Sequence, residues 1–389
     1  MALDPATATA AYIDALGADA LAKSAAYTAG NHWLVLWGLV VTGLVTWVIV
    51  RAGWLDRIAK RLAGRGPNVR VFVIALVYFF VASLLTLPWT LYEDWWRETQ
   101  YGRTSQPLGD AFGQFALAVV ISAVLTALLA VGVYLLLRRT GRRWWVWSSG
   151  LFAASLAVLL LLSPTLIEPL FNEFRPVPEG PVREALLGMA ERAGVPGDRL
   201  FVYDGSRQSN NFTANVAGVG PSARIAISDV AFEGVPLDEV KAVTAHEIGH
   251  YVLNHVWWTV GVLSLLALVA FYAVDRLYPR MARAFGTDAA LSDPRGLPVV
   301  VFVVTLVGVL AQPFENTLSR MHETSADRYS LTSVNLPDAL ASALVKTAEY
   351  RYPRPSTLQE VVFYTHPSVE RRVRMAMEWK AAHDADAAR

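Results

Sequence analysis

Long runs of apolar residues recur along the chain and predict helices that cross a membrane. A helix needs about 20 mostly apolar residues to span the hydrocarbon layer of a bilayer. About six stretches meet or approach that length: residues 32–50, 71–91, 112–137, 145–166, 256–274 and 297–311. The last of them is short for a full crossing, so it either extends to about residue 314 or tilts little. Trp and Tyr cluster at the ends of these runs, as in the aromatic belts of membrane proteins.

The composition agrees with this interpretation. Hydrophobic residues make up 54% of the 389 residues and charged residues only 17%, whereas soluble domains carry about 25% charged residues. The alternative, a soluble protein with long core helices, is disfavoured because several apolar runs of this length rarely occur together. The net charge of +1 gives no support to nucleic-acid binding, which requires a clustered basic surface.

The pattern divides the chain into three parts. Residues 1–31 are Ala-rich, lack the features of a signal peptide and predict a polar tail, helical or loose. Residues 32–171 carry four of the predicted spans. Residues 172–389 have the composition of a soluble domain, interrupted by two further spans at 256–274 and 297–313. Within this part, periodicity and turn residues predict strands at 199–204 and 224–228 and helices at 182–193, 237–254, 316–330, 337–349 and 368–382.

The strongest chemical signal is the run HEIGH, which begins at His246 and ends at His250 inside the predicted helix 237–254. Residues four apart share one face of a helix, so the two imidazoles can hold one metal ion. Glu247 lies on an adjacent part of that face and can take a proton from water at the metal. Because the chain has no cysteine, thiol catalysis is excluded and a metal must use His and carboxylate ligands. The motif is too specific to favour the alternative of two structural histidines, and it predicts one catalytic zinc ion per chain.

A catalytic zinc ion takes three protein ligands, so a third ligand must come from elsewhere in the chain. The best candidate is Glu323. It lies four residues before Asp327 on one predicted helix, so one of the two carboxylates can bind metal while the other orients a ligand. His322 is a rival, although it points to a different face, and an exposed carboxylate pair is the alternative to any metal role. Further along, His366 and the basic run Arg371, Arg372 and Arg374 offer groups that can stabilise a tetrahedral oxyanion near the metal, although by themselves they are typical of a solvated helix start.

With these residues in place, the chain resembles the type I CaaX prenyl proteases. These are integral membrane zinc metalloproteases of the gluzincin type, related to the heat-shock membrane zinc proteases. The likeness runs from about residue 71 to residue 374 and keeps the order and spacing of the zinc motif, the two carboxylates and the closing His366 with Arg372. Segments 87–102, 164–174 (PTLIEPLFNEF) and 201–206 (FVYDGS) are also similar to the family. The resemblance implies a mainly α fold: a polytopic membrane helical bundle that encloses a chamber, with a small α+β gluzincin-type zinc protease domain in 172–389.

The resemblance also implies a role for each matching residue. The matching positions are His246, His250 and Glu323 for the zinc ligands, Glu247 for the general base and acid, Asp327 for the carboxylate behind the ligands, and His366 and Arg372 for cleft residues that steady the substrate.

The strand that pairs with substrate departs from the family pattern. The family usually has Ser-Asn-Ala-Tyr there, whereas this chain has NNFTANV at 210–216. A gap-free alignment gives Thr213, Ala214 and Asn215 the substrate-binding positions, with Thr213 in place of the family's Asn and Asn211 or Asn215 as alternatives to it. An edge strand can still hold a peptide through main-chain hydrogen bonds. The additional leading span of eukaryotic members is not found.

These residues predict a membrane metalloendopeptidase that hydrolyses peptide bonds through zinc-activated water. Its partners are the lipid bilayer and a peptide or membrane-protein substrate, and not nucleic acid. The resemblance implies a lipidated, CaaX-like peptide, and the residues leave open whether the substrate is prenylated. The alternatives are a quality-control protease of membrane proteins without prenyl specificity and an inactive homologue that acts as a scaffold. A transporter or channel is disfavoured because the predicted spans contain few ionisable residues.

The predicted location is a multi-pass integral membrane protein, in the cell membrane if the host is bacterial. Two arguments on orientation disagree. Loops 51–70 and 138–143 are basic, and loop 276–295 is weakly basic. Basic loops of membrane proteins usually face the cytoplasm. With six spans, this rule places the catalytic domain outside the cell. The family resemblance places it in the cytosol, and the side of the active site stays open.

Overall fold

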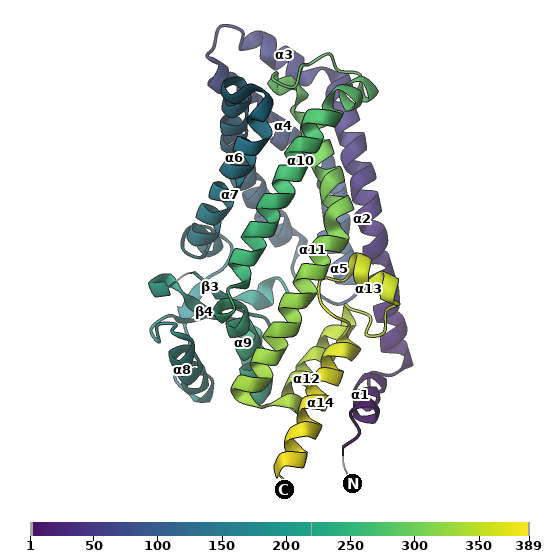
Figure 1. Ribbon diagram of the computed structural model, residues 1–389, viewed down its shortest axis with the longest axis vertical. Helices are drawn as coiled ribbons and strands as arrows, with labels where there is room; N and C mark the ends of the chain where they lie inside the picture. The colour runs from purple at the N-terminus through teal and green to yellow at the C-terminus, as the bar shows by residue number, and fades with distance from the viewer. Residues whose placement is uncertain (1–2, 219, 388–389) are drawn as a thin grey trace. The chain divides into compact units, whose positions relative to one another are not determined.

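The computed structural model describes residues 3–218 and 220–387, and the chain forms two compact units (Figure 1). The sheet unit comprises Met1–Trp33, Leu160–Trp258 and Gln312–Arg389, and the helical unit comprises Leu34–Leu159 and Thr259–Ala311. The predicted division into 1–31, 32–171 and 172–389 stays a prediction.

Long helices build the helical unit. Its elements are α2 (Ala18–Ala52) beyond residue 33, α3 (Trp54–Arg61), α4 (Pro67–Thr90), α5 (Arg97–Gln100), α6 (Leu108–Thr140), α7 (Trp144–Leu162) to residue 159, α10 (His255–Phe285) from residue 259 and α11 (Leu297–Val334) to residue 311.

Five helical segments of the described chain are long and apolar enough to cross a membrane. They are Ala18–Ala52, Pro67–Gln100, Leu108–Leu170, His255–Phe285 and Pro294–Val334. Each of the about six predicted spans lies in one of them. The third and fourth both fall in Leu108–Leu170, as α6 and α7, which a turn at Gly141–Arg143 separates. The predicted helical spans are therefore confirmed, with two of them joined into one segment.

Small side chains let α4 and α6 pack closely. One face of α4 buries Val71, Ile74 and Tyr78, which follow each other at helical spacing. The facing stripe of α6 is formed by Ala127 and Ala130, whose small side chains allow a close helix approach of the kind found in membranes. Large apolar side chains elsewhere in the helical unit stay exposed, among them Leu84 on α4, Leu128 on α6 and Leu310 on α11. Such a surface suits contact with lipid rather than water.

The sheet unit contains a four-stranded sheet in the order β1-β2-β4-β3. Its strands are β1 (Phe174–Pro176), β2 (Leu200–Tyr203), β3 (Ala214–Ala217) and β4 (Arg224–Ser228). Strands β2 and β4 are parallel, and β1 and β3 are antiparallel edge strands. The predicted strands at 199–204 and 224–228 are confirmed. The edge strand β3 overlaps the stretch 210–216, where the family resemblance places the strand that pairs with substrate.

Two helices cover one face of this sheet. Helices α8 (Pro181–Ala193) and α9 (Leu237–Val252) bury their apolar sides against Ile225 and Ile227 of β4. Leu186 and Met189 of α8 and Ile248 of α9 belong to the same core. This packing fixes α9, which carries the HEIGH run, against the strands.

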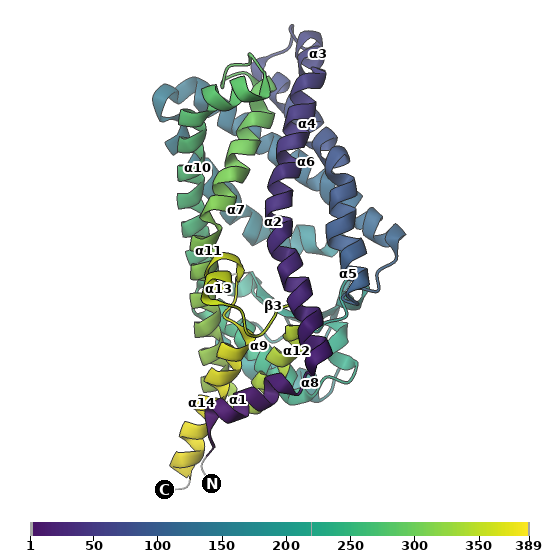
Figure 2. The same cartoon turned by 90° about the vertical axis from the view of Figure 1, so that its right-hand side faces the viewer.

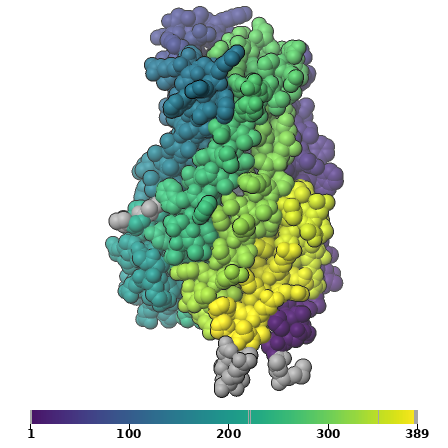
Figure 3. Space-filling model, in the orientation of Figure 1, coloured from purple at the N-terminus to yellow at the C-terminus, as the bar shows by residue number. Residues whose placement is uncertain are grey.

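A second core of the sheet unit joins helices from both ends of the chain. Helices α1 (Pro5–Asp14), α12 (Pro337–Lys346) and α14 (Val369–Ala387) lie together in Figure 2, and α1 also lies against α14 in the space-filling view (Figure 3). Ile13, Leu340 and Val373 are buried between them. The short helix α13 (Thr357–Phe363) precedes α14. The predicted C-terminal helices at 337–349 and 368–382 are confirmed with shifted ends.

Candidate metal centre

The predicted helix 237–254 is confirmed as α9. One of its faces packs against the core of the sheet unit, and the other carries the two histidines. Val240, Ala245 and Ile248 face the core of the sheet unit. His246 and His250 lie one turn apart, and their rings approach edge to face with centroids 4.8 Å apart. The buried apolar stripe therefore fixes the helix rotation that points both imidazoles towards α11.

Three side chains bring their polar atoms together at one point. His246 Nε2 and His250 Nε2 are 3.1 Å apart. The carboxylate of Glu323, on α11, lies 3.3 Å from His246 Nε2 and 3.4 Å from His250 Nε2. Tetrahedral zinc with bonds of about 2.0–2.1 Å separates its ligand atoms by roughly 3.3 Å. The three donors therefore have the spacing and the chemistry of a metal site.

The surroundings of these donors favour a cation. Glu323 is only 7% exposed, and its Oε2 has no hydrogen-bond partner among the described residues. Burial by itself would lower the pKa of His246, but the Asp327 and Glu323 carboxylates outweigh it and raise that pKa to about 10. A buried site that stabilises positive charge against desolvation, and in which one carboxylate oxygen forms no hydrogen bond to the described residues, fits a divalent ion.

Asp327 lies behind the donors rather than among them. It is fully buried, and its Oδ1 is 2.8 Å from His246 Nδ1, the ring nitrogen that faces away from the other donors. Arg372 on α14 donates two hydrogen bonds to the same carboxylate, at 2.7 and 2.6 Å. The arrangement holds the His246 ring in one orientation and leaves its Nε2 for the metal. Of the two carboxylates, Glu323, which the sequence favours as the ligand, is the one that faces both histidines.

His366 closes another side of the site, with its Nε2 3.2 Å from Glu323 Oε1. Its position depends on two α11 side chains that sequence reasoning missed. Arg320 donates to the carbonyl oxygens of Glu360 and Tyr364 at 2.7 and 2.6 Å, and Asn316 donates to that of Val362 at 2.7 Å. These bonds satisfy the C-terminal carbonyls of α13 just before His366. The one feature of the sequence that points to Arg320 and Asn316 is their spacing. They precede Glu323 by three and seven residues, which places all three on one face of a helix.

His322 lies outside the donor set. Its ring stacks on His255, with centroids 4.2 Å apart and planes 8° apart. The rival ligand that the sequence left open is therefore turned away from the three converging donors.

The predicted substrate-binding residues lie at the start of edge strand β3. The Thr213 hydroxyl is hydrogen-bonded to the Tyr203 hydroxyl at 2.5 Å, and Ala214 packs against the core of the sheet unit. The side-chain Oδ1 of Asn215 is buried and has no hydrogen-bond partner among the described residues. β3 pairs with β4 on one side only, so its other edge has no strand partner in the described chain. Of these three residues, Asn215 is therefore the one whose side-chain oxygen can accept a hydrogen bond from a ligand.

Gly249 allows α9 and α11 to approach closely. A Cβ at this position would lie 3.1 Å from Tyr329 Cβ and 3.2 Å from Ala326 Cα. We expect Gly249→Ala to destabilise the protein by about 1–3 kcal/mol, because the backbone of α11 must shift. The matched change Gly188→Ala on α8 meets only Arg192 Nη1 at 3.6 Å and should gain helix propensity. The midpoint of thermal unfolding in detergent measures both changes. Equal midpoints for the two variants would contradict a close approach at Gly249.

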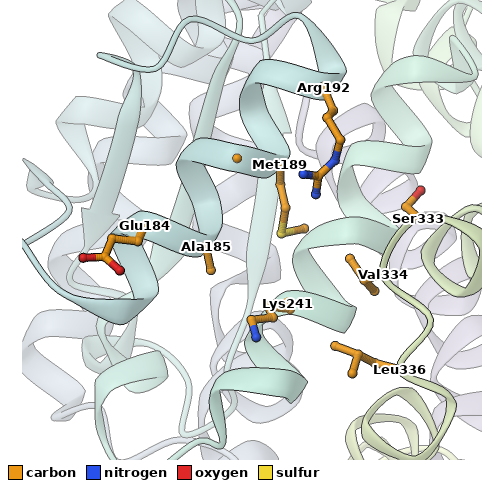
Figure 4. Close-up of a pocket in the computed structure, with 9 residues that line it drawn as sticks. Glu184, Ala185, Met189, Arg192, Lys241, Ser333, Val334 and Leu336 are labelled. Atoms are coloured by element: carbon orange, nitrogen blue, oxygen red, sulfur yellow. The ribbon is translucent and has the colours of Figure 1, made fainter.

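A pocket of about 610 Å³ lies elsewhere in the sheet unit, between α8, the start of α9 and the end of α11 (Figure 4). Arg192 and Lys241 bring positive charge to its wall, and Met189 and Val334 make it partly apolar. None of the predicted site residues lines it.

Two histidines of an HExxH helix with a carboxylate from a second helix are the arrangement of a metallopeptidase. Together with the membrane-capable helices, the site defines the class of membrane-integrated metalloproteases. The profile of peptidase family M48 matches residues 176–380, and that of the CAAX prenyl protease N-terminal region, five membrane helices, matches residues 5–173. The chain belongs to peptidase family M48, and it is an integral, multi-pass membrane protein.

Relatives and a solved structure agree with this assignment. An uncharacterized metalloprotease, YhfN, of Bacillus subtilis is 26% identical over 364 residues, which cover 92% of this chain and 85% of that protein. A CAAX prenyl protease 1 homolog of Arabidopsis thaliana is 29% identical over 310 residues, which cover 76% of this chain and 72% of that protein. The crystal structure of S. mikatae Ste24p has the same fold, with a TM-score of 0.75 at 20% identity, over 92% of this chain and 88% of that one. The predicted family and fold class are confirmed.

Proposed function

We propose that this metalloprotease is a zinc endopeptidase in which His246, His250 and Glu323 hold one zinc ion. The observation that carries the proposal is the convergence of two imidazole nitrogens 3.1 Å apart with the Glu323 carboxylate, whose Oε2 lies 3.3 Å from His246 Nε2 and whose Oε1 lies 3.4 Å from His250 Nε2. Two imidazoles and one carboxylate are a known ligand set of catalytic zinc, which keeps a fourth position open. Zinc bound there supplies the Lewis acidity that activates water towards a peptide carbonyl.

Glu247 is the proposed general base and acid. It is half-buried on α9 beside His246, and burial raises the pKa of its carboxyl, a shift that the two neighbouring histidines oppose. A raised pKa makes the carboxylate a better proton acceptor near neutral pH. Glu247 accepts a proton from the attacking water and then donates it to the leaving amine.

His366 and Arg372 have different proposed tasks. Burial, helped by the nearby positive charge of Arg351, lowers the pKa of His366 to about 3, so the imidazole is neutral at physiological pH. A neutral imidazole can donate its single N–H to the oxygen that becomes negative in the transition state. Arg372 is occupied by its two bonds to Asp327 and lies 3.4 Å from Glu323, so it mainly holds the two carboxylates in place.

The proposed substrate is a prenylated, CaaX-like peptide that adds a strand to the sheet. The open edge of β3 offers main-chain groups to an extended peptide, and Asn215 offers a buried acceptor for one further hydrogen bond. Several relatives bear the name CAAX prenyl protease 1, which supports the lipidated class. The alternative function is cleavage of membrane proteins without prenyl specificity, and the test below distinguishes the two.

The test compares two peptides of identical CaaX sequence, one farnesylated and one with an unmodified cysteine, with the purified protein in proteoliposomes. We expect the farnesylated peptide to be cleaved faster by at least tenfold, because burial of its lipid adds binding free energy of about 0.8 kcal/mol per CH₂ group. A chelator should abolish cleavage, and about one equivalent of Zn²⁺ per chain should restore it. Equal cleavage of the two peptides would contradict prenyl specificity, and cleavage that survives the chelator would contradict the zinc mechanism.

A further inference from the structure

A histidine five residues beyond His250 has no role in the HEIGH run, yet it lies against the metal centre. His255 is the first residue of α10 and is only 7% exposed. It belongs to the sheet unit, as do all the residues of the centre. A buried histidine at the start of a helix requires an account of its partners.

The chain turns sharply to bring His255 back onto the centre. α9 ends at Val252, and only Leu253 and Asn254 separate it from α10. Asn254 has φ of 59°, the left-handed conformation that asparagine tolerates better than most residues. Because the link is this short, the first side chain of α10 lies beside the last turn of α9.

His255 bridges the two helices that supply the proposed zinc ligands. Its Nδ1 is 2.9 Å from Nδ1 of His250, and its Nε2 is 3.1 Å from the hydroxyl of Ser325 on α11. The Ser325 hydroxyl in turn lies 2.9 Å from the carbonyl oxygen of His322. The stacked ring of His322 covers one face of His255.

The direction of each hydrogen bond follows from metal binding. His250 can offer the lone pair of Nε2 to a metal only if its proton is on Nδ1. That proton is then donated to Nδ1 of His255, which places the His255 proton on Nε2, facing the Ser325 hydroxyl. Ser325 completes the chain by donating to the backbone carbonyl of His322. Every donor therefore has an acceptor.

We propose that His255 is a positioning residue that fixes the ring orientation and tautomer of His250, and through it the affinity for zinc. The inference rests on the proposed zinc function. The two histidine ligands are then held from behind by different groups: His246 by the Asp327 carboxylate at 2.8 Å and His250 by a neutral imidazole. The His250 side chain keeps 27% of its surface exposed, against 9% for His246, so packing alone constrains it less.

The test uses three single variants of the full-length protein in detergent. His255→Phe keeps the ring and the stack on His322 but removes both hydrogen bonds. His255→Asn restores an acceptor near the position of Nδ1, and His322→Phe keeps the stack without touching either hydrogen bond. The measurements are the zinc dissociation constant, by competition with a chelator, and the visible absorption spectrum of the Co²⁺-loaded protein.

We expect His255→Phe to weaken zinc binding by about 10- to 100-fold and to change the Co²⁺ spectrum, because partners behind a metal ligand have effects of this size. His255→Asn should recover much of the affinity, and His322→Phe should match the wild type. Wild-type affinity and spectrum in His255→Phe, or an equal loss in His322→Phe, would overturn the proposal. If His255→Phe weakens zinc binding while the wild type cleaves no peptide, the positioning role stands and the proposed function fails.

Discussion

Glu247→Gln is expected to lower kcat for peptide hydrolysis by about 100- to 10,000-fold, the range of general acid–base catalysis. Gln has nearly the same shape but cannot accept the proton of water at neutral pH. The three proposed zinc ligands are untouched, so the variant should bind about one zinc ion per chain with wild-type affinity. The measurement pairs single-turnover cleavage with elemental analysis of zinc in the same preparation.

Glu191→Gln provides the matched control for this experiment. Glu191 is an exposed glutamate on α8, outside the metal centre, so its amide variant should cleave like the wild type. Hydrolysis by Glu247→Gln at the wild-type rate would remove Glu247 from the mechanism. Loss of zinc together with activity would instead give Glu247 a part in metal binding.

Asp327→Asn should have the largest effect on stability. Asp327 is fully buried and accepts two hydrogen bonds from Arg372, which is itself only 6% exposed. Burial opposes the charge of Arg372, but the Asp327 carboxylate outweighs it and raises the pKa of the guanidinium above its ordinary value. Without that carboxylate the buried guanidinium loses its main partner, which costs about 3–5 kcal/mol in such pairs. His246 also loses its partner, so zinc affinity should fall by about 10- to 100-fold.

Asp338→Asn is the matched control, because it also removes an ion pair but at an exposed position outside the metal centre. Asp338 pairs with Lys380 at 2.6 Å, but its side chain is 54% exposed, and such pairs are worth about 0–1 kcal/mol. Thermal unfolding in detergent and zinc competition measure both variants. If Asp327→Asn lowers the midpoint of thermal unfolding no more than Asp338→Asn does, the claim that the buried pair of Asp327 and Arg372 organises the site is contradicted.

The membrane helices could be predicted because hydropathy acts over a whole segment, but their ends could not. Residues 18–31 are too polar to be part of a span, yet α2 begins at Ala18, since an Ala-rich sequence continues a helix readily. The sixth span and the helix at 316–330 were predicted separately, whereas α11 runs through Pro313 without a break. Proline removes one helical hydrogen bond, and a long packed helix can tolerate that loss.

The short edge strands carry too little pattern to be predicted from periodicity, and only the family resemblance placed a strand at 210–216. β1 is three residues long and ends in Pro176, which suits an edge strand because proline cannot donate to a second neighbour. β3 is four residues long and lies in a stretch rich in Gly, Ser and Asn, so its pairing with β4 decides its structure.

The site could be predicted as far as local spacing determines it. The pair His246 and His250 follows from helix periodicity, whereas the choice between Glu323 and Asp327 depends on how α9 and α11 meet, which no local pattern contains. His255 was missed for the same reason: its partner on α11, Ser325, is 70 residues away in sequence. The roles of these residues stay predictions that the variants test.

The zinc K-edge X-ray absorption spectrum of the purified wild type tests the central claim most directly. A zinc ion held by His246, His250 and Glu323 with water in the fourth position should show four nitrogen or oxygen neighbours at about 2.0–2.1 Å, with the outer-shell signal of two imidazoles. Elemental analysis should give about one zinc per chain. A protein without zinc, or a spectrum without imidazole scattering, would contradict the assignment of this site as the catalytic centre.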